Sequence, residues 1–281
     1  MGKISFVTGK GGVGKSTVAL TLAYHLSSLN QKTLLVEMGK FSHFQEMLGI
    51  TIGYKPQQLQ KNFEIAHWTA EQCLREYVIH LLKLESFYNL LFDNKVSRTL
   101  LQAAPAIHEI ALLGKITSQE RKIGPSMDYD HIVVDSYASG HFTALLKAPI
   151  GLSAVVPLGT MKEQCESIRQ VLNDPKITDY YVVSLPEELT FIEALDLESD
   201  IKKLSKAEPH FVLNKKLDLK PSLFSKDETQ KDWKVFQDFL HKQQRFNYVH
   251  QKDFDLEVPF IFDEMNFADQ LQKISTGFKR V

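Results

Sequence analysis

Residues 9–17, near the N-terminus, have the types and spacing that bind phosphate groups. The run GKGGVGKST fits the pattern GxxxxGK[ST]. Its glycines let backbone N–H groups turn toward phosphate oxygens, because a side chain would block that approach. Lys15 can reach the β- and γ-phosphates of a nucleotide, and the Ser16 hydroxyl can hold Mg²⁺. We therefore expect ATP with Mg²⁺ as the ligand. The predicted binding residues are Gly11, Gly12, Val13, Gly14, Lys15, Ser16 and Thr17.

A second lysine, Lys10, stands early in this loop and makes it a deviant Walker A sequence. In proteins of this type that lysine reaches across a dimer to the nucleotide of the partner. The physical logic is a cation placed where charge develops on the transferring phosphoryl group. The sequence therefore predicts a catalytic role for Lys10 in a dimer, and the alternative is a solvated loop lysine.

The elements that position the loop are a strand and a helix. Ile4–Val7 is a short apolar run typical of a buried parallel strand. Residues 17–30 carry apolar side chains at helical spacing, and a second apolar run follows at Thr33–Val36. The order strand, loop, helix, strand is the opening unit of a parallel sheet.

Another predicted strand, His131–Val134, ends at Asp135. A carboxylate at that end of a parallel strand can face the phosphate-binding loop. We also expect a helix near residues 162–172 and a last helix at about 265–278. Further strands are predicted at residues 154–156, 181–183 and 211–213.

The domain organisation follows from this order of elements. The stretch from about 50 to 127 is predicted to be mostly helical, and no internal repeat or long linker divides the chain. The sequence therefore favours one α/β domain over residues 1–281, with a doubly wound, mainly parallel sheet and a helical insertion at about 50–127.

The composition excludes several classes of protein. Lys and Arg total 33 and Asp and Glu total 34, so the basic excess of a general nucleic-acid binder is missing. Cys73 and Cys165 form no CxxC pair, and no apolar run approaches a membrane span. We therefore expect a cytoplasmic protein with no nucleic-acid partner and no stable membrane anchor.

A short apolar stripe near the C-terminus has two possible structural interpretations. One is packing against the sheet, and the other is a basic amphipathic helix that binds membranes. Few basic residues accompany the stripe, so packing is expected. The stripe comprises Phe267, Leu271, Ile274 and Phe278.

Several segments, in order along nearly the whole chain, resemble the ArsA-like anion-pump ATPases and their relatives that target tail-anchored proteins. MinD and ParA are more distant cousins. The run DSYASGH at 135–141 is similar to the DTAPTGH segment of that family. The other similar segments are 105–109, 184–189 with Glu193, 213–215 and 258–260.

The resemblance implies roles for four residues. Asp135 would be the Walker B carboxylate that acts on Mg²⁺, and Gly140 would offer a backbone N–H near the γ-phosphate. Asn214 would read the adenine edge, with a turn residue as the alternative. Glu187 would lie near the nucleoside, with a solvated loop carboxylate as the alternative.

The segment after the second strand departs from the family. Its switch I Asp, which positions the attacking water, corresponds to Gly39 here. Losing such a group commonly lowers a rate by about 10²–10⁴-fold. Glu37, two residues earlier, is the candidate catalytic substitute, and His43 is a second one. Slow hydrolysis is therefore expected.

Two further departures concern metal and client binding. The zinc-binding CxxC of some targeting factors is missing, so no zinc is expected, and two isolated cysteines cannot form the three-thiolate arsenite site in one chain. Cys73 and Cys165 are expected to be small buried hydrophobes. All six Met residues lie outside residues 50–126, which argues against a Met-rich client groove.

The leading functional hypothesis is an ArsA-like ATPase that dimerises with itself or a paralogue. Its nucleotide cycle would drive a conformational switch or the handover of a protein client. One alternative is a weakly hydrolysing or non-hydrolysing nucleotide-binding subunit paired with a paralogue. A second alternative is a MinD- or ParA-like positioning ATPase.

Overall fold

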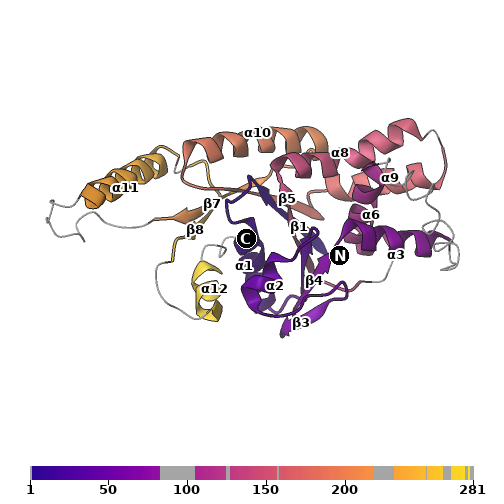
Figure 1. Cartoon of the computed structure of the whole chain (residues 1–281). Coiled ribbons are helices and arrows are strands. Elements are labelled where there is room, and N and C mark those ends of the chain that lie inside the picture. The colour runs from indigo at the N-terminus through magenta and orange to yellow at the C-terminus, as the bar shows by residue number, and fades with distance from the viewer. Residues whose placement is uncertain are drawn as a thin grey trace.

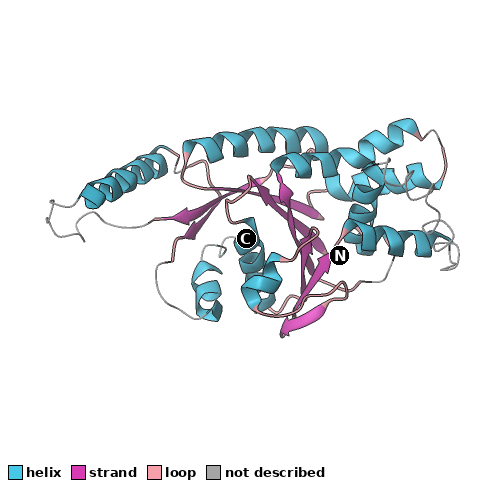
Figure 2. Cartoon of the chain, in the orientation of Figure 1, coloured by secondary structure: helices cyan, strands magenta, loops and turns pink. Residues whose placement is uncertain are grey.

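One mainly parallel sheet runs through the protein, flanked by helices on both faces (Figures 1 and 2). The computed structural model describes residues 2–82, 105–124, 127–156, 158–217, 231–250, 252–261, 267–275 and 278. Within these residues the sheet has eight strands in the order β3-β4-β2-β5-β1-β6-β7-β8. The strands are β1 (Lys3–Gly9), β2 (Thr33–Met38), β3 (Gln57–Gln60), β4 (Phe63–Trp68), β5 (His131–Ala138), β6 (Thr178–Ser184), β7 (His210–Lys216) and β8 (Leu256–Pro259).

The helices form two layers. In Figure 1, α8, α9 and α10 lie along the upper side of the sheet, and α1, α2 and α12 lie below it. The helices are α1 (Lys15–Ser28), α2 (His43–Leu48), α3 (Ala70–Leu82), α6 (Pro105–Ile116), α7 (Ser118–Arg121), α8 (Ser139–Val155), α9 (Thr160–Asn173), α10 (Glu188–Ser205), α11 (Lys231–Val249) and α12 (Phe267–Ser275). This is the doubly wound α/β fold that the sequence predicts.

The alternation of side chains along each central strand fills both layers. Phe6 and Val36 point into the core under α3, α6, α8, α9 and α10, whereas Val7 and Leu35 point into the core against α1 and α12. Successive residues of a strand face opposite sides of the sheet, and both sides are covered. A continuous apolar run such as ISFV is the consequence.

Strand β5 lies between β1 and β2. Asp135 is therefore in register with Val7 on one side and Glu37 on the other. The crossover brings the end of β5 beside the phosphate-binding loop that follows β1. The order of elements in the sequence does not state this adjacency.

Two sequence predictions about secondary structure are wrong. Residues 154 and 155, expected in a strand, end helix α8, because the apolar run from Phe142 continues at helical spacing through Pro149. The stretch expected to be mostly helical from about 50 to 127 begins instead with β3 and β4, and its first helix, α3, starts at Ala70. Residues 83–104 of this stretch lie outside the described residues. Strand β4 extends the parallel sheet beside β2, which buries Ile65 and Trp68.

Three of the four residues of the C-terminal stripe pack inside the fold, as expected, and the side chain of Phe267 lies outside the described part of the chain. Leu271, Ile274 and Phe278 are buried in the same core as α1. They cover α1 more than the sheet, because α12 lies against that helix. In the described part of the chain, no helix has the length and apolar character to cross a membrane.

Candidate functional site

The phosphate-binding loop joins β1 to the first turn of α1, as its motif predicts. Helix α1 begins at Lys15, and Gly14 before it adopts the left-handed conformation with φ 86°. A Cβ at Gly14 would lie 2.3 Å from Nδ2 of Asn214, so only glycine fits this position. The N-terminus of α1, which is the positive end of the helix dipole, therefore faces the centre of the phosphate-binding loop.

Asn214 holds the phosphate-binding loop from β7, which is two strands away from β1 in the sheet. It is buried at the end of β7, and its Nδ2 donates to the Val13 carbonyl at 2.8 Å. Its Oδ1 accepts from the Lys215 N–H at 2.9 Å. Both polar atoms of the side chain are therefore used within the protein, which is a positioning role that the sequence did not suggest. Its expected contact with adenine stays a prediction.

Lys15 is held over the loop. Its ammonium donates to the Lys10 carbonyl at 3.1 Å. Burial lowers the pKa of Lys15, and the nearby Asp135 carboxylate opposes that shift. A half-buried ammonium in a ring of backbone amides is placed to contact phosphate oxygens.

Asp135 is the buried carboxylate of the site. Burial raises the pKa of Asp135 to about 6 and the Glu37 carboxylate adds to the rise, while the Ser16 hydroxyl and the Lys15 ammonium oppose it. Its Oδ1 is buried with no hydrogen-bond partner among the described residues. An unpartnered buried carboxylate oxygen needs a cation or a bound water.

These features fit Mg-ATP. Space is open beside Gly11 and Gly12, where an added Cβ would meet nothing within 4 Å. Ser16 and Asp135 would hold Mg²⁺ as hard oxygen ligands, directly or through water. Within the described residues, no cluster of three or more His, Cys, Asp or Glu side chains forms another metal site.

Glu37 is occupied by its own loop. Its carboxylate is buried and accepts from the Ser42 hydroxyl, from the His43 N–H at 2.5 Å and from the Phe44 N–H at 3.4 Å. Glu37 thus fixes the start of α2 and neutralises the positive end of that helix. Its catalytic role stays a prediction, and these contacts compete with it.

Gly39 stands between Glu37 and α2 with φ 143°, a conformation that side chains rarely adopt. The nearest atom to an added Cβ is the Phe41 carbonyl oxygen at 3.8 Å. The backbone of the switch I segment therefore suits glycine, although there is room for a side chain.

Lys10 points to its own chain. Its ammonium lies 2.6 Å from Oε1 of Glu193 on α10. Gly140, in the first turn of α8, lines a small hollow that also includes Glu193. The loop, the start of α8 and α10 thus meet around Lys10, and Glu193 is a site residue that the sequence indicated only as part of a family segment.

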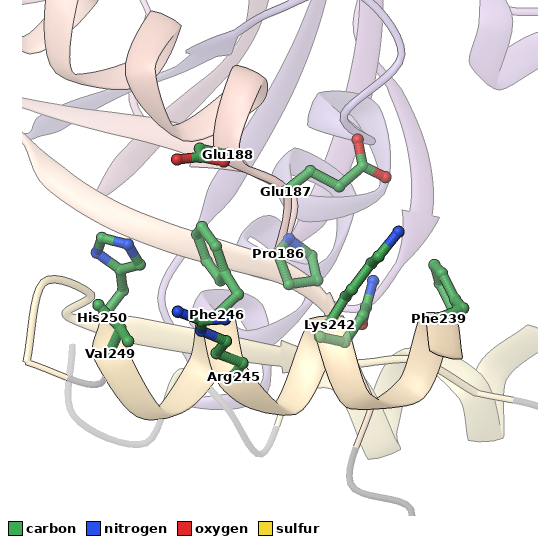
Figure 3. Close-up of a pocket in the computed structure, with 10 residues that line it drawn as sticks. Pro186, Glu187, Glu188, Phe239, Lys242, Arg245, Phe246, Val249 and His250 are labelled. Carbon is green, nitrogen blue, oxygen red and sulfur yellow. The ribbon is translucent and has the colours of Figure 1, made fainter. Parts of the chain in front are cut away.

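Glu187 is the residue just before α10, in the segment that joins β6 to that helix. Figure 3 shows it at the rim of a groove between residues 186–188 and α11. Its side chain makes no capping hydrogen bond to α10. Its predicted place near the nucleoside stays a prediction.

The family model described as anion-transporting ATPase matches residues 2–157 and 153–279 of this chain. Together the two matches span almost the whole sequence. The chain belongs to the anion-transporting ATPase family. The resemblance stated from individual segments is thereby confirmed.

The curated relatives are distant and mostly longer. ATPase BagA of Mycobacterium tuberculosis is 27% identical over 72% of this chain and 62% of its own length. The arsenical pump-driving ATPase of Escherichia coli is 26% identical over 74% of this chain and 38% of its own length. That of Acidiphilium multivorum is 24% identical over 74% and 38%. The chain therefore spans less than two thirds of these relatives.

The two cysteines lie apart from this site. Cys73 on α3 and Cys165 on α9 are buried, free thiols. Burial raises the pKa of the Cys73 thiol to about 12 and also raises that of Cys165. They are the small buried hydrophobes that the sequence predicts.

Proposed function

We propose that this chain binds Mg-ATP and hydrolyses it in a cycle that opens and closes a dimer, with self or a paralogue as the partner. The cycle would drive a conformational switch or the handover of a protein client. The observation that carries this proposal is the buried Asp135 carboxylate, whose Oδ1 has no hydrogen-bond partner among the described residues, beside a preformed loop at the start of α1. We place the activity in one domain and in the cytoplasm, which suits its two free buried thiols.

Each residue has a separate task in this proposal. The amides of residues 11–14 and the Lys15 ammonium hold the phosphates, and Ser16 and Asp135 hold Mg²⁺. Bound Mg²⁺ would neutralise the charge on the transferring phosphoryl group. Asn214 keeps the loop in the binding geometry.

Lys10 connects the site to the dimer. Because Lys15 and the amides already surround the phosphates of one copy, the use of Lys10 is on the nucleotide of the other copy. Its ammonium would exchange Glu193 for a phosphate oxygen when two loops come face to face. ATP that binds the closed dimer better than the open form then shifts the population toward closure.

A second candidate function is a weakly hydrolysing or non-hydrolysing subunit. Gly39 offers no group to orient water, and the oxygens of Glu37 accept hydrogen bonds from its own loop. Turnover measured on the purified chain, alone and with any paralogue, separates the two candidates.

Nucleotide binding is tested with Lys15→Ala. Removing a charge-assisted contact costs about 1.5–3 kcal/mol, so ATP affinity should fall about 10–150-fold by calorimetry. Lys32→Ala is the matched control, because Lys32 is a surface residue paired with Asp128. An unchanged affinity in folded Lys15→Ala protein would refute the proposed site.

Dimerisation is tested by sedimentation with a non-hydrolysable ATP analogue. The analogue should promote or tighten dimers, and Lys10→Ala should weaken that response while sparing binding to the monomer. A chain that stays monomeric with the analogue and every candidate paralogue contradicts the proposed dimer.

A further inference from the structure

Exposed apolar side chains gather on two neighbouring helices. Of the thirteen large apolar or aromatic side chains exposed in the described part of the chain, four lie on α11 and three on α10. Scattered exposed apolar residues are ordinary, but a gathered set marks a contact surface. The seven are Val235, Phe239, Tyr248, Val249, Leu189, Ile192 and Leu195.

Helix α11 carries a stripe of four apolar side chains and one lysine, Lys242. Val235, Phe239, Lys242, Phe246 and Val249 are separated by four, three, four and three residues, the spacing with which one helix face meets another helix. Figure 1 shows α11 extending beyond the β8 edge of the sheet. Val235, Phe239 and Val249 are 64%, 43% and 61% exposed, so the stripe is largely uncovered.

A groove of about 810 Å³ runs between α11 and the loop before α10. In Figure 3, Phe239, Lys242, Phe246 and His250 rise from α11 toward Pro186 on the opposite wall. The Oε1 of buried Gln243, which also lines the groove, has no hydrogen-bond partner among the described residues. The groove therefore has apolar space and an unused polar acceptor.

The two walls of the groove carry opposite charge. Glu187 and Glu188 stand on the α10 wall, and Lys242 and Arg245 stand on the α11 wall. Among the described residues, none of the four side chains forms an ion pair. A surface with an acidic side, a basic side and an apolar centre is complementary to a twofold-related copy of itself.

Helix α10 links this surface to the nucleotide. Leu189, Ile192 and Glu193 lie on one face of α10, since they are three and four residues apart. Glu193 holds Lys10 at 2.6 Å. A second copy that receives Lys10 at its own nucleotide would therefore come close to the exposed apolar residues beside Glu193.

We propose that a second copy of this chain docks on the α10–α11 surface, defined by Leu189, Ile192, Phe239, Val249 and the groove between them. Each copy places apolar side chains of this surface against the groove of the other. The acidic wall of one copy faces the basic wall of its twofold mate. This inference rests on the proposed ATP-dependent dimer and names the surface that forms it.

Apolar contacts are tested by sedimentation with the non-hydrolysable analogue. Phe239→Glu and Leu189→Glu each put a charge in the interface, so each should raise the dimer dissociation constant at least tenfold. Leu29→Glu is the matched control, because this exposed leucine follows the far end of α1. Analogue affinity of the monomer, measured at protein concentrations too low for dimers, should stay unchanged in all three variants.

Charge complementarity is tested by exchanging signs. Glu188→Lys alone and Arg245→Glu alone should each weaken self-association, because like charges then meet across the twofold axis. An equimolar mixture of the two variants should dimerise as wild type does, since every opposite-charge pair is restored. Rescue in the mixture is not expected of an effect on folding or on nucleotide binding.

The outcomes separate this surface from the dimer itself. If wild type dimerises with analogue and Lys10→Ala does not, while the glutamate variants dimerise as wild type, the proposed surface is overturned and the proposed function stands. A mixture that shows no rescue also overturns the surface. A wild-type chain that stays monomeric with analogue overturns both.

Discussion

The Asn214→Ala variant tests whether Asn214 fastens the phosphate-binding loop. The side chain donates to the Val13 carbonyl at 2.8 Å and accepts from the Lys215 N–H at 2.9 Å. Its removal leaves a buried carbonyl without a donor, at a cost of about 1–3 kcal/mol in the free energy of unfolding. Each kcal/mol lowers Tm by roughly 2–4 °C in a protein of about this size.

Nucleotide affinity distinguishes this role from reading of the adenine edge. A loosened loop binds every triphosphate less well, so ATP and GTP affinities should fall by a similar factor in calorimetry. Asn214→Asp keeps the Oδ1 acceptor for Lys215 and loses the donor to Val13, so it should be at least as damaging. Unchanged stability together with a loss confined to ATP would refute our reasoning and favour the adenine contact.

Two further predictions concern the carboxylates and switch I. Burial raises the pKa of Asp135 from 3.8 to about 6, so stability of the nucleotide-free protein should fall as pH rises from about 4 to 6, because the folded state resists ionisation. Asp135→Asn should remove this pH dependence in thermal melts and raise the free energy of unfolding at pH 7 by on the order of 2–3 kcal/mol. The same variant should lose Mg²⁺-dependent ATP binding. A variant that melts below wild type at pH 7 contradicts this reasoning. Gly39→Asp should raise ATP turnover. It should also lower the free energy of unfolding by about 1–3 kcal/mol, because an aspartate is strained at the φ of 143° that Gly39 adopts. Turnover that does not rise, in a variant that still binds ATP, counts against the missing switch I carboxylate as the cause of slow hydrolysis. Robust wild-type turnover that Glu37→Gln abolishes would show instead that Glu37 orients the water.

The sequence predicted those features that depend on local chemistry. The glycine spacing and Lys15 predicted the phosphate-binding loop, because backbone exposure to phosphates needs those residues wherever the loop lies. An apolar run ending at Asp135 predicted a carboxylate at the C-terminal edge of a parallel strand. Apolar spacing at Leu271 and Ile274 likewise predicted a packed helix.

Local patterns failed where a short apolar run fits two structures. Residues 154–156 are apolar and compact, which suits a buried strand as well as the last turn of a helix. The helical state of residues 154 and 155 depends on α8, which starts at Ser139, and Val156 follows the helix in an extended conformation. In the two strands between 57 and 68, polar and apolar residues alternate only weakly. These strands form because β4 pairs with β2 and β3 pairs with β4 at the edge of the sheet.

Tertiary structure alone decided how the site is assembled. The insertion of β5 between β1 and β2 sets Asp135 beside both the loop and Glu37, and sequence order does not state which strands are neighbours. Long-range contacts gave Asn214 its hold on Val13, across 201 residues, and gave Lys10 its partner Glu193, across 183. A residue type limits which contacts a side chain can make, and the fold determines which partner comes within reach.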